Sequence, residues 1–156
     1  MNRYKKKKRQ ITRSKKTVVD GIQFASKLEA HMYKLLKKEG IPFKYEGEKY
    51  VLIDGFRSES SSYEKTATKK YLHDRGHKKI LPITYTPDFI DSEYPPRYVI
   101  ECKGNPNERF PLVWKLFKRY IHLKGWNTSL YMPRNQKDCA EVIACLRQEG
   151  FFSQDD

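Results

Sequence analysis

Cysteine is scarce in this sequence, and its few copies form no recognisable pattern. The 156 residues include three cysteines, at Cys102, Cys139 and Cys145. They contain no CxxC pair, and their number is odd. Since no secretion signal precedes them, a disulfide framework is not expected, and the three thiols should be reduced, as in the cytoplasm.

Long apolar runs are also missing. No run approaches the ~18 residues of a membrane-spanning helix, and the basic N-terminal end lacks the apolar stretch of a signal peptide. We therefore expect a cytoplasmic protein with no membrane partner. A zinc site is not expected either. His73 and His77 have the ligand spacing of a helix, but Gly76 lies between them and no cysteine or acid completes a set.

Acidic residues are too few to balance the basic ones. The chain has 32 Lys and Arg against 19 Asp and Glu, a formal net charge of +13. Such an excess is typical of proteins that bind nucleic acid, although a merely basic protein, such as those of ribosomes, is the alternative. Hydrophobic residues make up 38% and aromatic residues 13%, which suffices for one core in a chain of this length.

The N-terminal stretch has no acid at all. Residues 1–16 hold nine Lys or Arg and little that is apolar. Such a basic arm cannot build a core, so we expect it to be disordered when free and to contact phosphates, with a solubilising tail as the alternative. Five of its cations are consecutive: Lys5, Lys6, Lys7, Lys8 and Arg9. Residues 17–156 are predicted to form a single domain.

Apolar periodicity predicts an α/β (α+β) fold, in which a mixed central sheet is flanked by helices. Helices are expected at residues 24–39, 110–124 and 137–148. Strands are expected at residues 43–53 (one strand or two short ones), from 88 onward, at 98–103 and at 128–132.

A basic insertion at about residues 55–79 is harder to interpret. Residues 63–73 carry a thin apolar stripe that suggests a helix. We interpret the insertion as a DNA-facing element, since insertions of this length are usually functional or disordered. Four basic side chains beyond the arm are candidates for nucleic-acid contact: Lys69, Lys70, Lys115 and Arg119. For the last two, ordinary solvated charges are an equal alternative.

Two short apolar runs each lead to an acid. One reads Tyr85-Thr86-Pro87-Asp88-Phe89-Ile90, and the other reads Tyr98-Val99-Ile100-Glu101-Cys102-Lys103-Gly104. Side chains at i and i+2 of a strand share a face, so Glu101 and Lys103 should project together and Cys102 the other way. Charges at the end of a buried strand need a reason, because unpaired buried charge costs free energy.

Metal-dependent phosphodiester cleavage would use this set of residues. Hard cations such as Mg2+ prefer carboxylate and carbonyl oxygens. A cation between Asp88 and Glu101 would remove the repulsion between them. A neighbouring lysine could position water or stabilise charge on a phosphate.

Pro87-Asp88 followed by Glu101-Cys102-Lys103 resembles the PD-(D/E)XK nuclease superfamily. Within it, the pattern is similar to the phage endonuclease I group, which resolves Holliday junctions. That group carries an acid on its first helix, matched here by Ser26-Lys27-Leu28-Glu29, and then a segment matched by Phe43-Lys44-Tyr45-Glu46. The resemblance covers residues 24–104. Asp88 and Glu101 lie 13 residues apart, somewhat more than in that group, which indicates a longer hairpin.

The resemblance implies a restriction-endonuclease-like core and a Mg2+-dependent endonuclease, with Mn2+ able to substitute. Asp88, Glu101 and the backbone carbonyl of Cys102 would bind the metal, and Lys103 would orient or activate water. Glu29 would complete the acidic pocket. The products would carry a 5′-phosphate, the substrate would be branched DNA, and a homodimer would suit paired nicks in a junction.

Three alternatives stay open at this level. Glu29 also fits a capping box with Ser26, which would give it a purely structural role. The enzyme could instead cut duplex or fork DNA during phage genome processing. The third is a non-catalytic basic nucleic-acid-binding protein, in which Asp88, Glu101 and Lys103 form a structural salt-bridge group.

Overall fold

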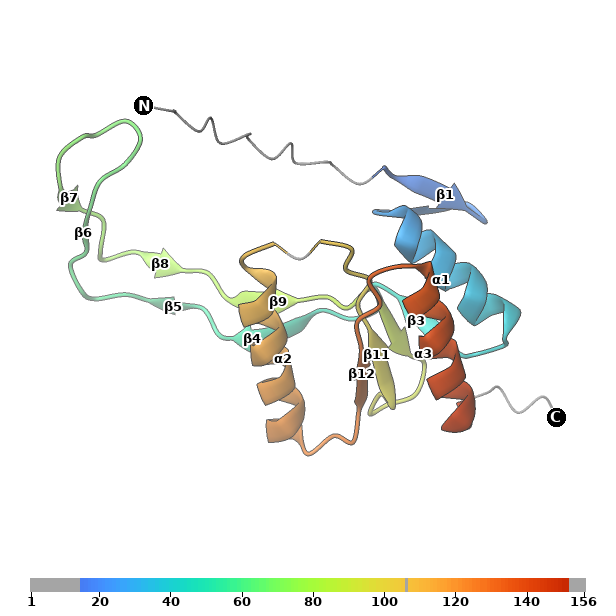
Figure 1. Cartoon of the computed structure of the whole chain (residues 1–156). Helices are drawn as coiled ribbons and strands as arrows, with labels where there is room; N and C mark the ends of the chain where they lie inside the picture. The colour runs from blue at the N-terminus through green and yellow to red at the C-terminus, as the bar shows by residue number, and fades with distance from the viewer. Residues whose placement is uncertain (1–14, 106, 152–156) are drawn as a thin grey trace, which may run out of the picture.

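A four-stranded mixed sheet forms the centre of the molecule (Figure 1). The structure, a computed structural model, describes residues 15–105 and 107–151. The strands follow the order β12-β11-β10-β3. Their bounds are β3 (Phe43–Tyr45), β10 (Phe89–Asp91), β11 (Tyr98–Ile100) and β12 (Ser129–Tyr131). β10 is antiparallel to both β3 and β11, whereas β11 and β12 are parallel. The predicted mixed sheet is therefore confirmed.

Helices cover both faces of this sheet. They are α1 (Lys27–Lys38), α2 (Phe110–Lys124) and α3 (Gln136–Gln148). Because side chains alternate along a strand, Phe89 and Ile100 pack with α1 and α3 in one core cluster. Ile90 and Val99 pack with α2 in a second cluster on the opposite face. The sheet is thus the middle of three layers, which is the predicted arrangement of helices flanking a sheet.

The first helix starts three residues later than predicted. Ser26 caps it, so the helix begins at Lys27, and Phe24 belongs instead to a hairpin. That hairpin pairs β1 (Thr17–Val19) with β2 (Ile22–Phe24). Its two-residue turn has positive φ at both positions, 50° at Asp20 and 75° at Gly21. Asp-Gly is the favoured sequence for such a turn because glycine, and to a lesser degree aspartate, tolerates this conformation.

The other two helices lie close to where the sequence places them. α2 has the predicted bounds. Pro111 fits its first turn, where no N–H is required, and Gly125, with φ of 65°, ends it. α3 begins one residue before the predicted start, because the side chain of Asn135 caps it by accepting a hydrogen bond from the Asp138 N–H.

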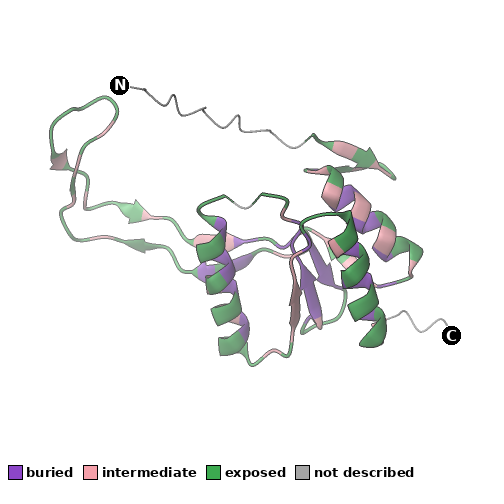
Figure 2. Ribbon diagram, viewed as in Figure 1, coloured by how far each residue is buried: buried purple, intermediate pink, exposed green. Residues whose placement is uncertain are grey.

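Residues 50–85 form a long two-stranded antiparallel ribbon, called the ribbon from here on. Three strand pairs follow one another from base to tip: β4 (Tyr50–Ile53) with β9 (Ile83–Tyr85), β5 (Phe56–Arg57) with β8 (Lys79–Ile80), and β6 (Tyr63–Glu64) with β7 (His73–Asp74). The base packs against α2, and the rest extends away from the helices (Figure 1). Figure 2 shows buried residues in β10 and β11, on parts of the helices and at the ribbon base, whereas the outer ribbon is exposed or intermediate.

The predicted helix at residues 63–73 is wrong. Its apolar stripe has no core to pack against, since Tyr71 and Leu72 remain 62% and 60% exposed. Without burial of an apolar face, a short helix is marginal in water. The backbone instead pairs across the ribbon, where the Arg75 N–H donates to the Ser62 carbonyl at 2.7 Å.

Two further observations bear on the predictions. Among the helices of residues 15–105 and 107–151, none is long and apolar enough to cross a membrane. The five consecutive cations, Lys5, Lys6, Lys7, Lys8 and Arg9, lie outside the residues that the structure describes.

Candidate active site

The two acids of the predicted metal site lie at neighbouring strand ends. Asp88 directly precedes β10 and Glu101 directly follows β11, and the antiparallel register pairs Phe89 with Ile100. A hydrogen bond fixes this junction, since the backbone N–H of Cys102 donates to Asp88 Oδ2 at 2.7 Å. The structure therefore brings together the two acids that the sequence singled out.

Glu101 is only 3% exposed, and its carboxylate accepts hydrogen bonds from two side chains. Lys103 Nζ donates to Glu101 Oε1 at 3.0 Å, which confirms that these side chains share a side of the chain. The Tyr85 hydroxyl donates to Glu101 Oε2 at 2.7 Å. Lys103 also places its ammonium 4.6 Å from the centre of the Phe110 ring. The carboxylate is thus oriented by a cation and a hydroxyl.

The role of Tyr85 was not predicted. Tyr85 belongs to the sequence stretch around Asp88, but nothing in the sequence pairs it with Glu101, 16 residues away. The contact depends on how β9, at the base of the ribbon, lies beside the end of β11. A tyrosine three residues before the first acid was the one available signal.

Cys102 points to the opposite side, as the alternation of the strand predicts. Its side chain lies in the core cluster with Cys139 of α3. A hydrogen bond with Cys139 and then burial raise the pKa of the Cys102 thiol, so the thiol stays protonated and is a poor metal ligand.

The carbonyl of Cys102 is better suited to a cation. The register that pairs Phe89 with Ile100 would place Pro87 opposite Cys102. Because proline has no N–H, it cannot donate a ladder hydrogen bond to that carbonyl. The sheet therefore stops pairing at the carbonyl that the sequence predicts as a metal ligand.

Glu29 takes part in capping α1 together with Ser26, and its charge also acts on Asp88. Its N–H donates to Ser26 Oγ at 3.1 Å, and Ser26 Oγ donates back to its carboxylate at 2.8 Å. The Tyr45 hydroxyl donates to the same carboxylate at 2.8 Å. Glu29 is 5% exposed, and its charge acts on Asp88. The capping role is thus present, and it does not remove Glu29 from the neighbourhood of the site.

Asp88 carries the electrostatic signature of a crowded acidic site. Burial, followed by the charges of Glu101 and Glu29, raises the pKa of Asp88 to about 8. The Cys102 N–H and the charge of Lys103 oppose this rise without cancelling it. The negative charges of Glu101 and Glu29 thus disfavour ionisation of Asp88, and a bound cation would relieve that repulsion.

The donor set fits a hard cation that keeps part of its water shell. It consists of the carboxylates of Asp88 and Glu101 and the carbonyl of Cys102, all oxygen donors of the kind Mg2+ prefers. Within residues 15–105 and 107–151, no three His, Cys, Asp or Glu side chains gather closely enough to hold a metal ion. This geometry suits two carboxylates supplemented by water better than a protein cage with four side-chain ligands.

The predicted nucleic-acid contacts do not gather at this site. Lys69 and Lys70 lie in the loop between β6 and β7, at the far end of the ribbon, and both are exposed. Lys115 and Arg119 are exposed on α2. They therefore face solvent on two separate elements.

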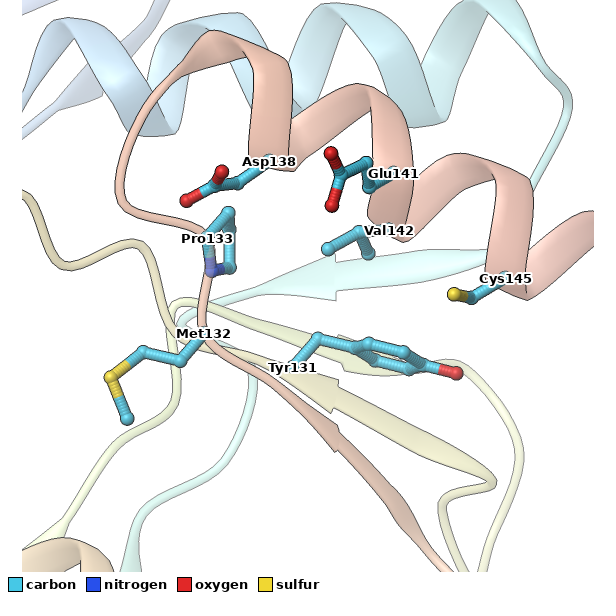
Figure 3. Close-up of a pocket in the computed structure, with 7 residues that line it drawn as sticks. All are labelled: Tyr131, Met132, Pro133, Asp138, Glu141, Val142 and Cys145. Carbon is cyan, nitrogen blue, oxygen red and sulfur yellow. The ribbon is translucent and has the colours of Figure 1, made fainter.

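A pocket of about 250 Å3 lies between β12 and α3 (Figure 3). Tyr131 and Val142 contribute to its wall, together with the carboxylates of Asp138 and Glu141 at its rim. Asp138 already accepts a hydrogen bond from the Arg134 N–H. None of the four predicted catalytic side chains lines this pocket.

Comparison with known proteins places the chain in a family without assigning it an activity. No match was found among curated proteins or among solved structures. One family matches residues 9–132, which include the ribbon and all four predicted catalytic residues, and its description reads "Protein of unknown function (DUF1064)". Since the match covers most of the sequence, the chain belongs to the DUF1064 family.

Proposed function

We propose that this chain is a Mg2+-dependent DNA endonuclease of the PD-(D/E)XK type. One observation carries the proposal: two acids from neighbouring strand ends, Asp88 and Glu101, lie together with a lysine that donates to one of them. The raised pKa of Asp88 supports it, because strongly perturbed pKa values cluster at functional sites.

The residues divide the task among them. Asp88, Glu101 and the Cys102 carbonyl would hold the cation, which supplies stabilisation of the charge that develops on the phosphate. Tyr85 orients the Glu101 carboxylate through its hydroxyl. The Lys103 ammonium lies beside Glu101, and its N–H groups would position the attacking water. Glu29 adds negative charge and anchors the start of α1.

The proposed substrate is branched DNA, such as a four-way junction, cut to leave 5′-phosphate ends. The net charge of +13 supports a nucleic-acid partner, and the resemblance to junction-resolving enzymes supports the branched form. Paired nicks would require a homodimer with two-fold symmetry. We place this activity in the cytoplasm, with Mn2+ able to replace Mg2+.

A second candidate function is a non-catalytic nucleic-acid-binding protein. The observation that favours it is the Lys103–Glu101 ion pair, at 3.0 Å and largely buried, which would by itself satisfy one acid without a metal. In that case the acids stabilise the fold, and no cation is needed for function.

A cleavage panel distinguishes these candidates. Wild type and Glu101→Gln would be incubated with a labelled four-way junction, a fork, a linear duplex, single strands and RNA, in Mg2+ or in EDTA. We expect paired nicks in the junction that require Mg2+. The variant should lose at least about 10³-fold in rate, equivalent to roughly 4 kcal/mol, while retaining DNA binding. Cutting of every DNA would support the nuclease but contradict junction selectivity.

Thermal unfolding gives a readout that does not depend on activity. In wild type, Mg2+ should raise Tm by mass action, since it binds the folded state. Asp88→Asn, which preserves an oxygen acceptor for the Cys102 N–H, should raise Tm in EDTA and abolish the Mg2+ response. A lack of Mg2+ response in wild type, combined with no cleavage of any substrate, would favour the binding protein.

A further inference from the structure

We propose that the outer ribbon inserts into the major groove of the duplex DNA that flanks the site of cleavage. The inference rests on the proposed function, because it takes DNA as the partner. It adds an element that would contact the duplex far from the acids. A two-stranded β-ribbon is one of the two elements that the major groove of B-DNA accommodates. Beyond its base, the ribbon extends from the body of the molecule as such an element (Figure 1).

The charge at the tip suits a phosphate backbone. Residues 65–72, called the tip below, contain three lysines and no acid. In the described part of the chain, neither Lys65, Lys69 nor Lys70 forms an ion pair, and all three are exposed. Their ammonium groups are therefore available to displace counterions from DNA.

Two arginines of the ribbon differ from the lysines at its tip. Arg57 lies 3.6 Å from Glu59, and Arg75 lies 3.6 Å from Glu64. These two arginines are paired, whereas the exposed Lys78 and Lys79, between the tip and the base, resemble the tip lysines in forming no ion pair within the described residues. Unpaired positive charge therefore runs from β8 to the tip.

Apolar side chains flank these lysines. Tyr63, Tyr71 and Leu72 are 66%, 62% and 60% exposed. Large apolar groups that stay mostly exposed at the end of the ribbon contribute little to a core, but they can contact thymine methyl groups and sugars within a groove. The tip thus combines cations for the backbone with apolar groups for the groove.

The ribbon is held in shape before any partner binds. Asp74 accepts hydrogen bonds from the N–H groups of Ser62, at 2.9 Å, and Gly76, at 2.8 Å. These two bonds lower the pKa of Asp74 to about 2. The strands come so close that a Cβ on Gly76 would lie 2.0 Å from the Ser60 carbonyl oxygen. A preformed element loses less conformational freedom on binding than a disordered loop.

The base of the ribbon connects the tip to the acids. Tyr85, the last residue of β9, donates to Glu101, and Asp88 follows three residues later. The chain runs 15 residues from Tyr50 to Lys65 and 13 residues from Leu72 back to Tyr85, which corresponds to at most about 50 Å, or roughly 15 base pairs of duplex. A ribbon seated in the groove would therefore define which phosphate reaches the site.

A second copy of the chain is a less suitable occupant. Each copy carries a net charge of +13, so a basic tip would approach a surface of its own sign. Duplex RNA is also unsuitable, because its major groove is too deep and narrow for protein elements. The geometry and charge together favour duplex DNA.

The test removes the tip charge and compares it with a matched control. The variant is Lys65→Gln, Lys69→Gln and Lys70→Gln together. The control is Lys34→Gln, Lys38→Gln and Lys137→Gln, three exposed lysines on α1 and α3, outside the ribbon. Both variants have the same net charge. Binding to a 30-base-pair duplex would be measured by fluorescence anisotropy in EDTA at several salt concentrations, so that cleavage is not needed for the readout.

We expect the tip variant to lose at least about tenfold in affinity and its salt slope to fall by about 2.7, or 0.9 for each lost phosphate contact. The control should change much less. Dimethyl sulfate should show guanine N7 atoms protected by wild type and exposed with the tip variant, since N7 lies in the major groove. Circular dichroism would check that both variants remain folded.

Three results would overturn the inference: equal losses in both variants, unchanged N7 reactivity in wild type, or equal affinity for an RNA duplex. A change in mass by light scattering, with DNA affinity unchanged, would assign the tip to a second copy instead. Cleavage by wild type in Mg2+ is measured in parallel. If wild type binds as expected but never cuts, the proposed nuclease function fails while the groove contact stands.

Discussion

The four-stranded sheet and the ribbon are both built from strands of two to four residues, yet the central strands of the sheet bury their side chains and the outer strands of the ribbon expose theirs. All residues of β10 and β11 are buried, because helices cover both faces of the sheet. In the outer ribbon, strands such as β5 are fully exposed. Short strands can therefore be stabilised either by layers packed against them or by pairing with each other alone.

This difference in burial determines how charged side chains interact in each region. In the sheet, every acid is held by named partners, as Glu101 is by Tyr85 and Lys103. In the outer ribbon, charges face water, where an ion pair contributes little. The sheet therefore determines the geometry of charged groups, whereas the ribbon presents them to a partner.

The largest effect is expected from comparing two aromatic truncations, one in the buried region and one on the exposed ribbon. Phe117 is fully buried between the ribbon base and the sheet, so Phe117→Ala should lower the free energy of unfolding by about 3–5 kcal/mol. Tyr71→Ala, at the exposed tip, should change it by less than about 0.5 kcal/mol. Chemical denaturation measures both. Equal losses would mean that the tip packs against the body in solution.

The second test compares two ion pairs. Asp91 is 2% exposed and accepts from Arg97 Nε at 2.5 Å and Nη2 at 3.0 Å. Burial alone would raise the pKa of Asp91, but the hydrogen bonds from Arg97 lower it overall. Asp91→Asn should cost about 2 kcal/mol at neutral pH. Glu64→Gln, which removes an exposed pair on the ribbon, should cost less than about 0.5 kcal/mol.

The pH dependence of this effect has a definite sign. Because the folded-state pKa of Asp91 lies below its usual value of 3.8, the pair stabilises the protein above that value. The stabilisation is lost as pH falls through the lower, folded-state pKa. Denaturation curves of wild type and Asp91→Asn should therefore converge as the pH drops below about 3.8. A difference that stays constant through acid pH would contradict the ion-pair explanation.

The third test addresses the hydrogen bond between Tyr85, at the ribbon base, and Glu101, at the end of β11. Tyr85→Phe keeps the ring but removes the hydroxyl that donates to Glu101, and we expect it to cost about 1.5 kcal/mol. If Glu101 serves in catalysis, kcat should fall more than KM rises, because the carboxylate loses its orientation. Tyr63→Phe makes the same chemical change on the exposed ribbon and serves as control. An unchanged kcat would leave Tyr85 with a structural role only.

The smallest global effect is expected for Gly76→Ala. The new Cβ would collide with the Ser60 carbonyl, so the ribbon must open locally. Amides of Arg75 and His77, which donate to Ser62 and Ser60, should exchange with solvent faster. The amide of Glu101 in the core should be unaffected, and total stability should change by less than about 0.5 kcal/mol. Faster exchange in the core as well would show that the ribbon folds cooperatively with the sheet.

The sequence by itself determined the local features of this protein. Pro111 and Gly125 bound α2 because they limit a helix through their own backbone chemistry. The two-residue period of a strand placed Glu101 beside Lys103 and turned Cys102 away. These predictions succeed because they depend on neighbours within a few residues, whose relative positions the backbone geometry dictates.

Only the tertiary structure decided which distant groups meet. Tyr85 with Glu101, Tyr45 with Glu29 and Asp91 with Arg97 are set by how strands and turns lie beside one another, and no local pattern encodes that pairing. The same reason explains the failed helix at residues 63–73. Its periodicity suits a helix, but whether a helix forms depends on a surface to bury its apolar face, and the fold offers none there.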